Sequence, residues 1–171
     1  MKIFEEIRDI SGEKFEIIAL SGYIFAAFNI SLSFSLIFKF SFSFYIFLLL
    51  IFVLFILNFI FSAITSLYID MQVDNSFRMK DIFYFYGITY YLSFLLLPAV
   101  YFYLYKGSGI YFFLIIFFFL WLSRLLFIKH KTSFGFINSF VAIFFPYMLV
   151  MVLLFLFLIT LSILSFIYLY G

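Results

Sequence analysis

The stretch "FYIFLLLIFVLFILNFIFSAITSLY", residues 44–68, decides the fold, because it runs for 25 residues without a charged side chain. A helix needs about 20 consecutive apolar residues to cross the hydrocarbon core of a bilayer. Inside lipid, a helix also satisfies its own backbone hydrogen bonds, which an open strand cannot do. The stretch therefore predicts a transmembrane helix.

Apolar segments of the same kind lie on both sides of this one and predict an all-α, polytopic membrane bundle of five transmembrane helices. The expected spans are about 17–38, 44–68, 82–105, 110–128 and 138–165. The last apolar stretch begins near residue 136 and is too long for one upright span, yet no charge or turn signal divides it. Its length leaves two alternatives open, which are one tilted helix and a helix with a re-entrant segment.

The composition agrees with a chain whose solvent is the bilayer. Apolar residues make up 68% of the chain, charged residues 11%, and the mean hydropathy is +1.30. A soluble domain is about 45–50% apolar and about 25% charged. The chain has no Cys and one His, His130, which excludes disulfides, thiolate metal sites and a two-histidine zinc site.

The first 16 residues differ from the rest of the chain, because they are polar and mixed in charge. Apolar residues at helical spacing predict a short amphipathic helix at the cytoplasmic membrane surface. We therefore divide the chain into an N-terminal segment, 1–16, and a five-span membrane domain, 17–171.

The basic residues predict the orientation in the membrane. With five spans, eight of them fall on the side of the N-terminus: Lys2, Arg8, Lys14, Arg78, Lys80, Arg124, Lys129 and Lys131. The other side has Lys39, where a turn is expected, and Lys106. Cytoplasmic loops carry the excess of Lys and Arg, so the N-terminus is predicted in the cytoplasm and the C-terminus outside.

Asp70 and Asp74 are the first candidates for chemistry, since two aspartates four residues apart share one face of a helix. Membrane prenyltransferases use aspartates at such spacing to hold magnesium on a diphosphate. Those enzymes need a second acidic cluster, and Asp81 and the N-terminal acids form no matching motif in a second helix. The pattern favours solvated loop carboxylates, with no metal site, no cofactor and no catalytic residue.

His130 lies in "IKHKTS", three residues before Ser133. A catalytic histidine needs a carboxylate to orient it, and no acidic residue follows Asp81. The stretch is therefore interpreted as a polar cytoplasmic loop. The basic residues are scattered among short loops, so nucleic-acid binding is not expected either.

Few polar residues occur inside the predicted spans. Asn29 and Asn58 lie near the middle of the first two spans, at similar depth, and could bond across that helix pair as intramembrane polar glue. Arg124 is near the inner end of the fourth span and is expected to extend its side chain to the headgroups. Pro98 and Pro146 should each kink a helix.

The chain resembles the Yip-type (Ypt/Rab-interacting protein) membrane domain family, as a bacterial relative. Before the third span, "NSFRMKDIFYFYG" gives a Ser-Phe-basic stretch with a Tyr nine residues after the Phe, although Asp74 and Asn75 stand where the family has a Gly pair. A Trp in the fourth span, a loop with His and Ser, and an early Pro in the fifth follow in the family's order. The matching positions are Ser76, Phe77, Tyr86, Pro98, Trp121, His130, Ser133 and Pro146.

This resemblance implies a non-enzymatic, multi-pass protein of the bacterial cytoplasmic membrane that organises the membrane or acts as a scaffold. Its expected partners are the lipid bilayer, a cytoplasmic protein and further copies of itself. Residues 1–16, 69–81 and 124–135 would form the docking face. The residues leave two alternatives: a small transporter or transporter subunit, with Asn29 and Asn58 in a polar path, and a metal-dependent lipid-modifying enzyme, with Asp70 and Asp74.

Overall fold

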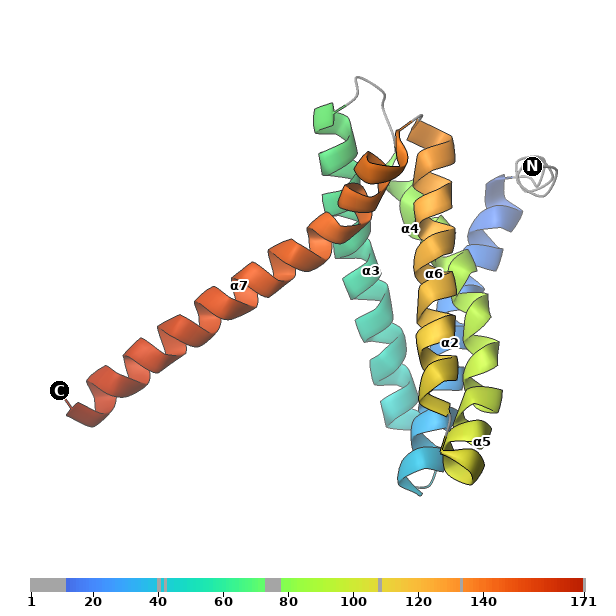
Figure 1. Cartoon of the computed structure of the whole chain (residues 1–171), viewed down its shortest axis with the longest axis horizontal. Helices are drawn as coiled ribbons and strands as arrows, with labels where there is room; N and C mark the ends of the chain where they lie inside the picture. Colours follow the sequence, from blue (N-terminus) through green and yellow to red (C-terminus); the bar gives the residue numbers. More distant parts are fainter. Residues whose placement is uncertain are drawn as a thin grey trace.

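The computed structural model describes residues 12–39, 41, 43–72, 78–107, 109–132 and 134–170, with the backbone alone at 12, 13, 166, 167, 169 and 170. These residues form helices joined by short turns (Figure 1). The elements are α2 (Gly12–Phe38), α3 (Phe44–Gln72), α4 (Met79–Thr89), the 3₁₀ helix η1 (Tyr90–Leu95), α5 (Leu96–Lys106), α6 (Gly109–Thr132) and α7 (Phe136–Tyr170).

The prediction of five long apolar helices is confirmed. Within the part of the chain that is described, five helices are long and apolar enough to cross a membrane. They are Lys14–Phe38, Phe44–Gln72, Met79–Lys106, Gly109–Thr132 and Phe136–Ser165. By helix length and hydropathy the chain is a multi-pass membrane protein. Residues 12–16, assigned above to the N-terminal segment, form the first turn of α2, and 1–11 lie outside the described residues.

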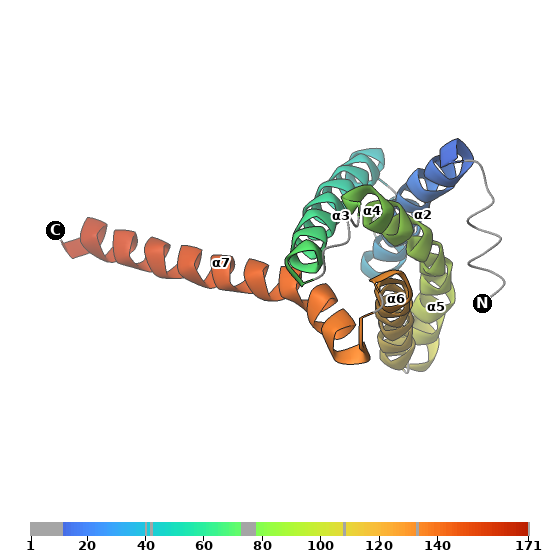
Figure 2. The ribbon, with the colours of Figure 1, turned by 90° about the horizontal axis from the view of Figure 1, so that it is seen from above.

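Four of these long helices form a bundle, and α7 joins it only near its own start before leaning away (Figures 1 and 2). Helix α7 is continuous over 35 residues, so the described part holds one long helix and no re-entrant break. At 1.5 Å per residue it is about 52 Å long. A hydrocarbon core of about 30 Å can hold such a helix if it is tilted.

Two residues with positive φ end helices at the side of the bundle away from the start of α2. Lys39, where the sequence predicts a turn, has φ 55° directly after α2. Gly107 has φ 67° and follows α5. A left-handed residue after the last helical turn stops a helix and bonds its free carbonyls, which explains the short connections there.

Helices α2 and α4 approach each other closely at two glycines. A Cβ at Gly22 would overlap the carbonyl oxygen of Gly87 and lie 2.8 Å from its carbonyl carbon. A Cβ at Gly87 would likewise overlap the carbonyl oxygen of Ala19. Small residues let helix backbones come into contact inside a membrane. This contact brings the third span against α2.

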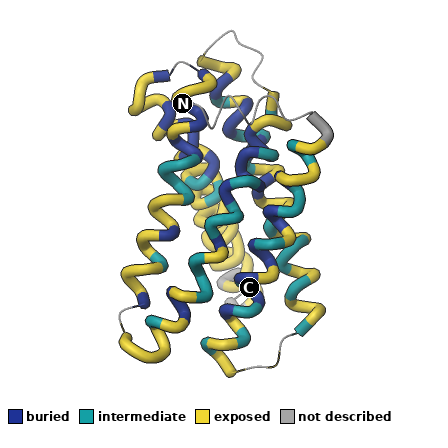
Figure 3. The backbone as a smooth tube through the Cα atoms, turned by 90° about the vertical axis from the view of Figure 1, so that its right-hand side faces the viewer, coloured by how far each residue is buried: buried dark blue, intermediate teal, exposed yellow. Residues whose placement is uncertain are grey.

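A buried hydrophobic cluster joins the end of α3, the start of α4, the end of α6 and the start of α7. Figure 3 shows how buried and exposed residues are distributed along the helices. Its buried members are Ile69, Ile82, Phe85, Tyr86, Leu125, Phe127, Ile128, Phe134, Ala142 and Ile143. Phe85 stacks on Phe127 with 3.8 Å between ring centroids. The cluster fixes the four elements that position the candidate site.

The third span changes to a 3₁₀ helix over Tyr90–Leu95, shortly before Pro98. Proline has no N–H to bond the carbonyl four residues earlier, and its ring collides with that carbonyl, so a regular α-helix is disfavoured there. Residues three apart eclipse on a 3₁₀ helix, which puts Tyr90 and Ser93 on one face. The proline expected to kink this span therefore lies beside a segment that presents polar side chains.

Candidate functional site

Arg124 is the most unusual side chain in the bundle, because it is charged and only 6% exposed. The expectation that it extends to the headgroups is wrong. It is held among the helices instead, where aromatic faces and oxygen acceptors of the neighbouring spans surround it. A charged residue inside a membrane helix bundle is rare and is a candidate functional residue by default.

Two tyrosine rings of the third span cover the guanidinium group of Arg124. Its central carbon lies 4.1 Å from the ring centroid of Tyr86 and 5.1 Å from that of Tyr90. A cation over a desolvated aromatic face gains about 2 kcal/mol or more. These rings lower the free-energy cost of burying the charge without neutralising it.

The same group makes three long hydrogen bonds. Its Nε donates to Thr89 Oγ1 at 3.3 Å, its Nη1 to the Tyr147 hydroxyl at 3.5 Å and its Nη2 to Asn58 Oδ1 at 3.5 Å. Bonds from arginine to a carboxylate or phosphate are about 2.7–2.9 Å long. The Nη1 and Nη2 donors, which form the fork of the guanidinium, are therefore the least well bonded.

No carboxylate neutralises Arg124 within the part of the chain that is described. The ion pair of Lys80 with Glu16 lies elsewhere, at the surface where α2 and α4 begin. We call the group formed by Arg124 with Tyr86, Thr89, Tyr90, Asn58 and Tyr147 the arginine cage. It carries one net positive charge, which sits among neutral side chains.

The cage is assembled from four spans, each for a local reason. On α3 the polar residues Asn58 and Ser62 are four apart, which puts both on one buried face of the helix. Asn58 Nδ2 donates to the hydroxyl of Tyr90 at 2.9 Å, and Asn58 Oδ1 accepts from Arg124 Nη2 at 3.5 Å. Thr89 Oγ1 donates to the carbonyl of Tyr86 at 2.7 Å and keeps its lone pairs for Arg124.

Two polar atoms close to the cage in sequence have no hydrogen-bond partner among the described residues. They are Ser62 Oγ, one turn after Asn58, and Trp121 Nε1, one turn before Arg124. Buried polar groups are nearly always bonded, and each exception asks for an explanation. Both atoms are hydrogen-bond donors, and neither they nor Arg124 have a negatively charged acceptor among the described residues.

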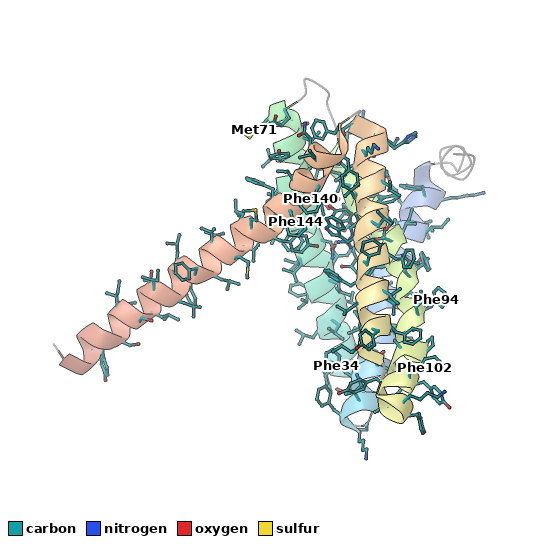
Figure 4. All side chains as sticks on the ribbon, viewed as in Figure 1. Phe34, Met71, Phe94, Phe102, Phe140 and Phe144 are labelled. Carbon is teal, nitrogen blue, oxygen red and sulfur yellow. The ribbon has the colours of Figure 1, made fainter. Side chains whose placement is uncertain are left out.

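An apolar groove of about 470 Å³ lies between α6 and α7, next to the cage. Its lining residues are Phe117, Phe118, Trp121, Phe140, Phe144 and Tyr147. Figure 4 shows Phe140 and Phe144 where α7 meets α6, and their rings lie 4.9 Å and 5.6 Å from that of Trp121. Tyr147 lines this groove and also accepts the Nη1 bond, so it borders both sites.

The two asparagines bond to the third span and not to each other, which corrects the expected amide pair. Asn29 Nδ2 donates to Ser93 Oγ at 3.2 Å, and Asn58 Nδ2 donates to the Tyr90 hydroxyl at 2.9 Å. The reason is that the third span packs against both helices and places hydroxyls nearer to each amide. A role of these amides as glue stays a prediction.

The positions of the family-like motif are spread over the structure. Tyr86 is in the cage, Trp121 lines the groove, Pro146 is buried in α7, Pro98 is exposed in α5 and His130 is exposed near the end of α6. Ser76, Phe77, Ser133 and Asp74 lie outside the described residues.

The proposed magnesium pair is not brought to a metal site by the described part of the structure. Asp70 is exposed near the end of α3, and Asp74 is outside the described residues. A search of the described side chains finds no group of three that could hold a metal ion. The exposed position of Asp70 fits the solvated carboxylate favoured above.

Comparison of the chain with protein-family models, with curated proteins and with solved structures finds no match. The resemblance to the Yip-type family therefore stays a prediction, and function has to be argued from the geometry. One signal in the sequence could have identified the cage. Arg124 precedes Lys129 by five residues, which places it about 7.5 Å deeper along α6 than the first lysine of the polar end.

Proposed function

We propose that this chain is a non-enzymatic membrane protein that binds an oxyanion at Arg124, inside its helix bundle. The observation that carries the proposal is a guanidinium group that is 6% exposed, without a carboxylate partner in the described residues. Removing an ion from water costs several kcal/mol even after the protein relaxes. An oxyanion at the fork of Arg124 would cancel the charge and form two charge-assisted bonds.

The alternative is that the cage is purely structural. Two cation–π contacts and three hydrogen bonds can hold a buried arginine, and they favour this simpler interpretation. Yet a buried charge is weak support for stability, because apolar residues of similar volume are often as stable or more stable. The unpaired donors at Ser62 and Trp121 favour a bound acceptor.

Direct binding tests this function. Purified protein in a neutral detergent would be incubated with labelled phosphate, acetate and oleate, and the binding of each measured at equilibrium. We expect at least one of these oxyanions to bind, and Arg124→Met to weaken that binding at least tenfold. Lys131→Met is the matched control, because it removes an equal charge from an exposed position on the same helix.

Two results would contradict the proposal: no oxyanion binds to the wild-type chain, or Arg124→Met binds as well as Lys131→Met does. Flux of the bound anion into proteoliposomes that depends on Arg124 would establish the transporter alternative. In that case the polar path would run through Asn58 and Arg124, since Asn58 Oδ1 accepts from Nη2.

A second function, a scaffold with a cytoplasmic docking face, is favoured by the separation of the charges. The exposed charged residues at the end where α2 and α4 begin are Lys14, Asp70, Arg78, Lys80, Asp81, Lys129 and Lys131. The opposite end has Lys39 and Lys106 among the described residues. This separation supports the cytoplasmic placement of the first end. Alanine substitutions across 1–16, 69–81 and 124–135 that left all co-purifying proteins unchanged would remove this role.

A further inference from the structure

We infer that the oxyanion at Arg124 is the small headgroup of an anionic lipid, whose apolar chain lies in the groove between α6 and α7. The lipid class is a carboxylate or a phosphate monoester on a long chain. The inference rests on the proposed function and goes one step further, because it names the kind of molecule that carries the anion.

The first argument is the continuity between the charge and the groove. Tyr147 lines the groove and its hydroxyl is 3.5 Å from Arg124 Nη1. Trp121 lines the groove too, and stands one helical turn before Arg124 on α6. A molecule in the groove therefore lies against Tyr147, the residue whose hydroxyl accepts one of the two longest hydrogen bonds of the guanidinium fork.

The second argument is the chemistry of the groove lining. All six lining residues are aromatic, and the surface that they present to the groove is apolar. Its volume of about 470 Å³ lies within the range of about 300–1,000 Å³ typical of small-molecule sites. An apolar groove beside a buried cation matches the chain of an anionic amphiphile, whereas a free inorganic anion would gain nothing from it.

The third argument is the number of hydrogen-bond donors that lack a charged acceptor. Arg124 offers Nη1 and Nη2, and a carboxylate or phosphate accepts from both in parallel. Trp121 Nε1, one helical turn before Arg124 on α6, is a further buried donor without a hydrogen-bond partner among the described residues. A headgroup with two oxygens satisfies both guanidinium donors together.

The depth of Arg124 in the bundle and the rings that enclose it limit the size of the headgroup. Arg124 lies about 7.5 Å deeper along α6 than Lys129, below the polar end of the bundle. The rings of Tyr86 and Tyr90 cover the guanidinium at 4.1 Å and 5.1 Å. A choline headgroup is bulky and would bring a second cation beside Arg124, so zwitterionic lipids should be rejected.

Native mass spectrometry in a neutral detergent would test the inference with defined probes. The lipid probes are oleate, dioleoyl phosphatidic acid and dioleoyl phosphatidylcholine, and the chainless probes are acetate and inorganic phosphate. We expect oleate or phosphatidic acid to bind at least tenfold more tightly than phosphatidylcholine and than the chainless anion with the same headgroup. Phe144→Ala, in the groove, should weaken lipid binding about tenfold and leave the chainless anions unaffected.

The matched control is Phe155→Ala, because Phe155 is exposed on α7 beyond the groove residues and should have no effect. If Arg124→Met fails to fold, Arg124→Lys serves in its place, since it keeps a charge and loses the two-pronged geometry. We expect it to weaken the preferred lipid about tenfold.

The outcomes separate this inference from the proposed function. If acetate or phosphate binds as tightly as its lipid counterpart and Phe144→Ala changes neither, the lipid inference is wrong and oxyanion binding stands. If no probe binds in a manner that depends on Arg124, both are wrong. Equal binding of phosphatidylcholine and phosphatidic acid also overturns the lipid inference.

Discussion

The backbone contact between α2 and α4 gives the sharpest stability prediction, through Gly22→Ala. The new Cβ would overlap the carbonyl oxygen of Gly87 and lie 2.8 Å from its carbonyl carbon. Ordinary van der Waals contact begins at about 3.4 Å, so the two helices would have to move apart by at least about 0.6 Å. Both contacting groups are backbone atoms, which cannot rotate away as a side chain can.

The size of the effect follows from three contributions. Overpacking a well-packed interface costs about 1–3 kcal/mol, and a clash with backbone belongs at the upper end. Separation of the helices also disturbs the bond from the buried Tyr23 hydroxyl to the Phe83 carbonyl, 2.7 Å long and worth about 1 kcal/mol. Alanine in place of glycine favours a helix by about 1 kcal/mol, which offsets that loss. We therefore expect Gly22→Ala to lower the free energy of unfolding by about 3 kcal/mol.

Thermal or denaturant unfolding in mixed micelles measures this change. The control is Gly135→Ala, because a Cβ at Gly135 would meet no heavy atom within 4 Å. We expect the control to stay within about 0.5 kcal/mol of the wild-type chain. If Gly22→Ala were as stable as Gly135→Ala, the two backbones would not be in contact and the packing of the third span described here would be wrong.

Three further predictions test other parts of the account. Tyr23→Phe should lower the free energy of unfolding by about 1 kcal/mol, since it removes the hydroxyl that bonds Phe83, and the measured loss should vanish for the exposed Tyr101→Phe. A double-mutant cycle of Asn58→Leu and Tyr90→Phe should give a coupling of about 0.6 kcal/mol, because their side chains bond at 2.9 Å; additive losses would refute the contact. A reporter fused after residue 171 should score outside the cytoplasm, and a cytoplasmic score would reject the five-span orientation.

Much of the architecture is predictable from the sequence because it depends on one-dimensional properties. As a helix, the apolar run 44–68 is long enough to cross the hydrocarbon core of a bilayer, and the same holds for the other four segments. Lys39 interrupts the apolar residues and ends α2 with a positive φ. The length of the last segment predicted a tilted helix as one of two alternatives, and α7 is continuous.

The arginine cage could not be predicted in the same way. The prediction that Arg124 lies near the headgroups depended on its position along one helix. It took no account of which side chains the neighbouring helices present to it. Whether it reaches outward or inward depends on the rings of Tyr86 and Tyr90, which only the packing of the third span brings to α6. The expected pairing of Asn29 with Asn58 failed for the same reason, because depth alone does not say which helix supplies the partner.

The account's central claim is that Arg124 serves a bound oxyanion and not the stability of the empty bundle. The direct measurement is the midpoint of thermal unfolding of the wild-type chain and of Arg124→Met, each with and without the tightest-binding oxyanion. Without it, Arg124→Met should be at least as stable as the wild type, since an unneutralised buried charge is lost. At a concentration of about 100 times Kd, the anion should stabilise the wild-type chain by about 2.7 kcal/mol and the variant hardly at all. The claim would be contradicted if Arg124→Met without the anion were destabilised by about 3 kcal/mol or more, and if the anion raised the unfolding midpoint of both chains equally.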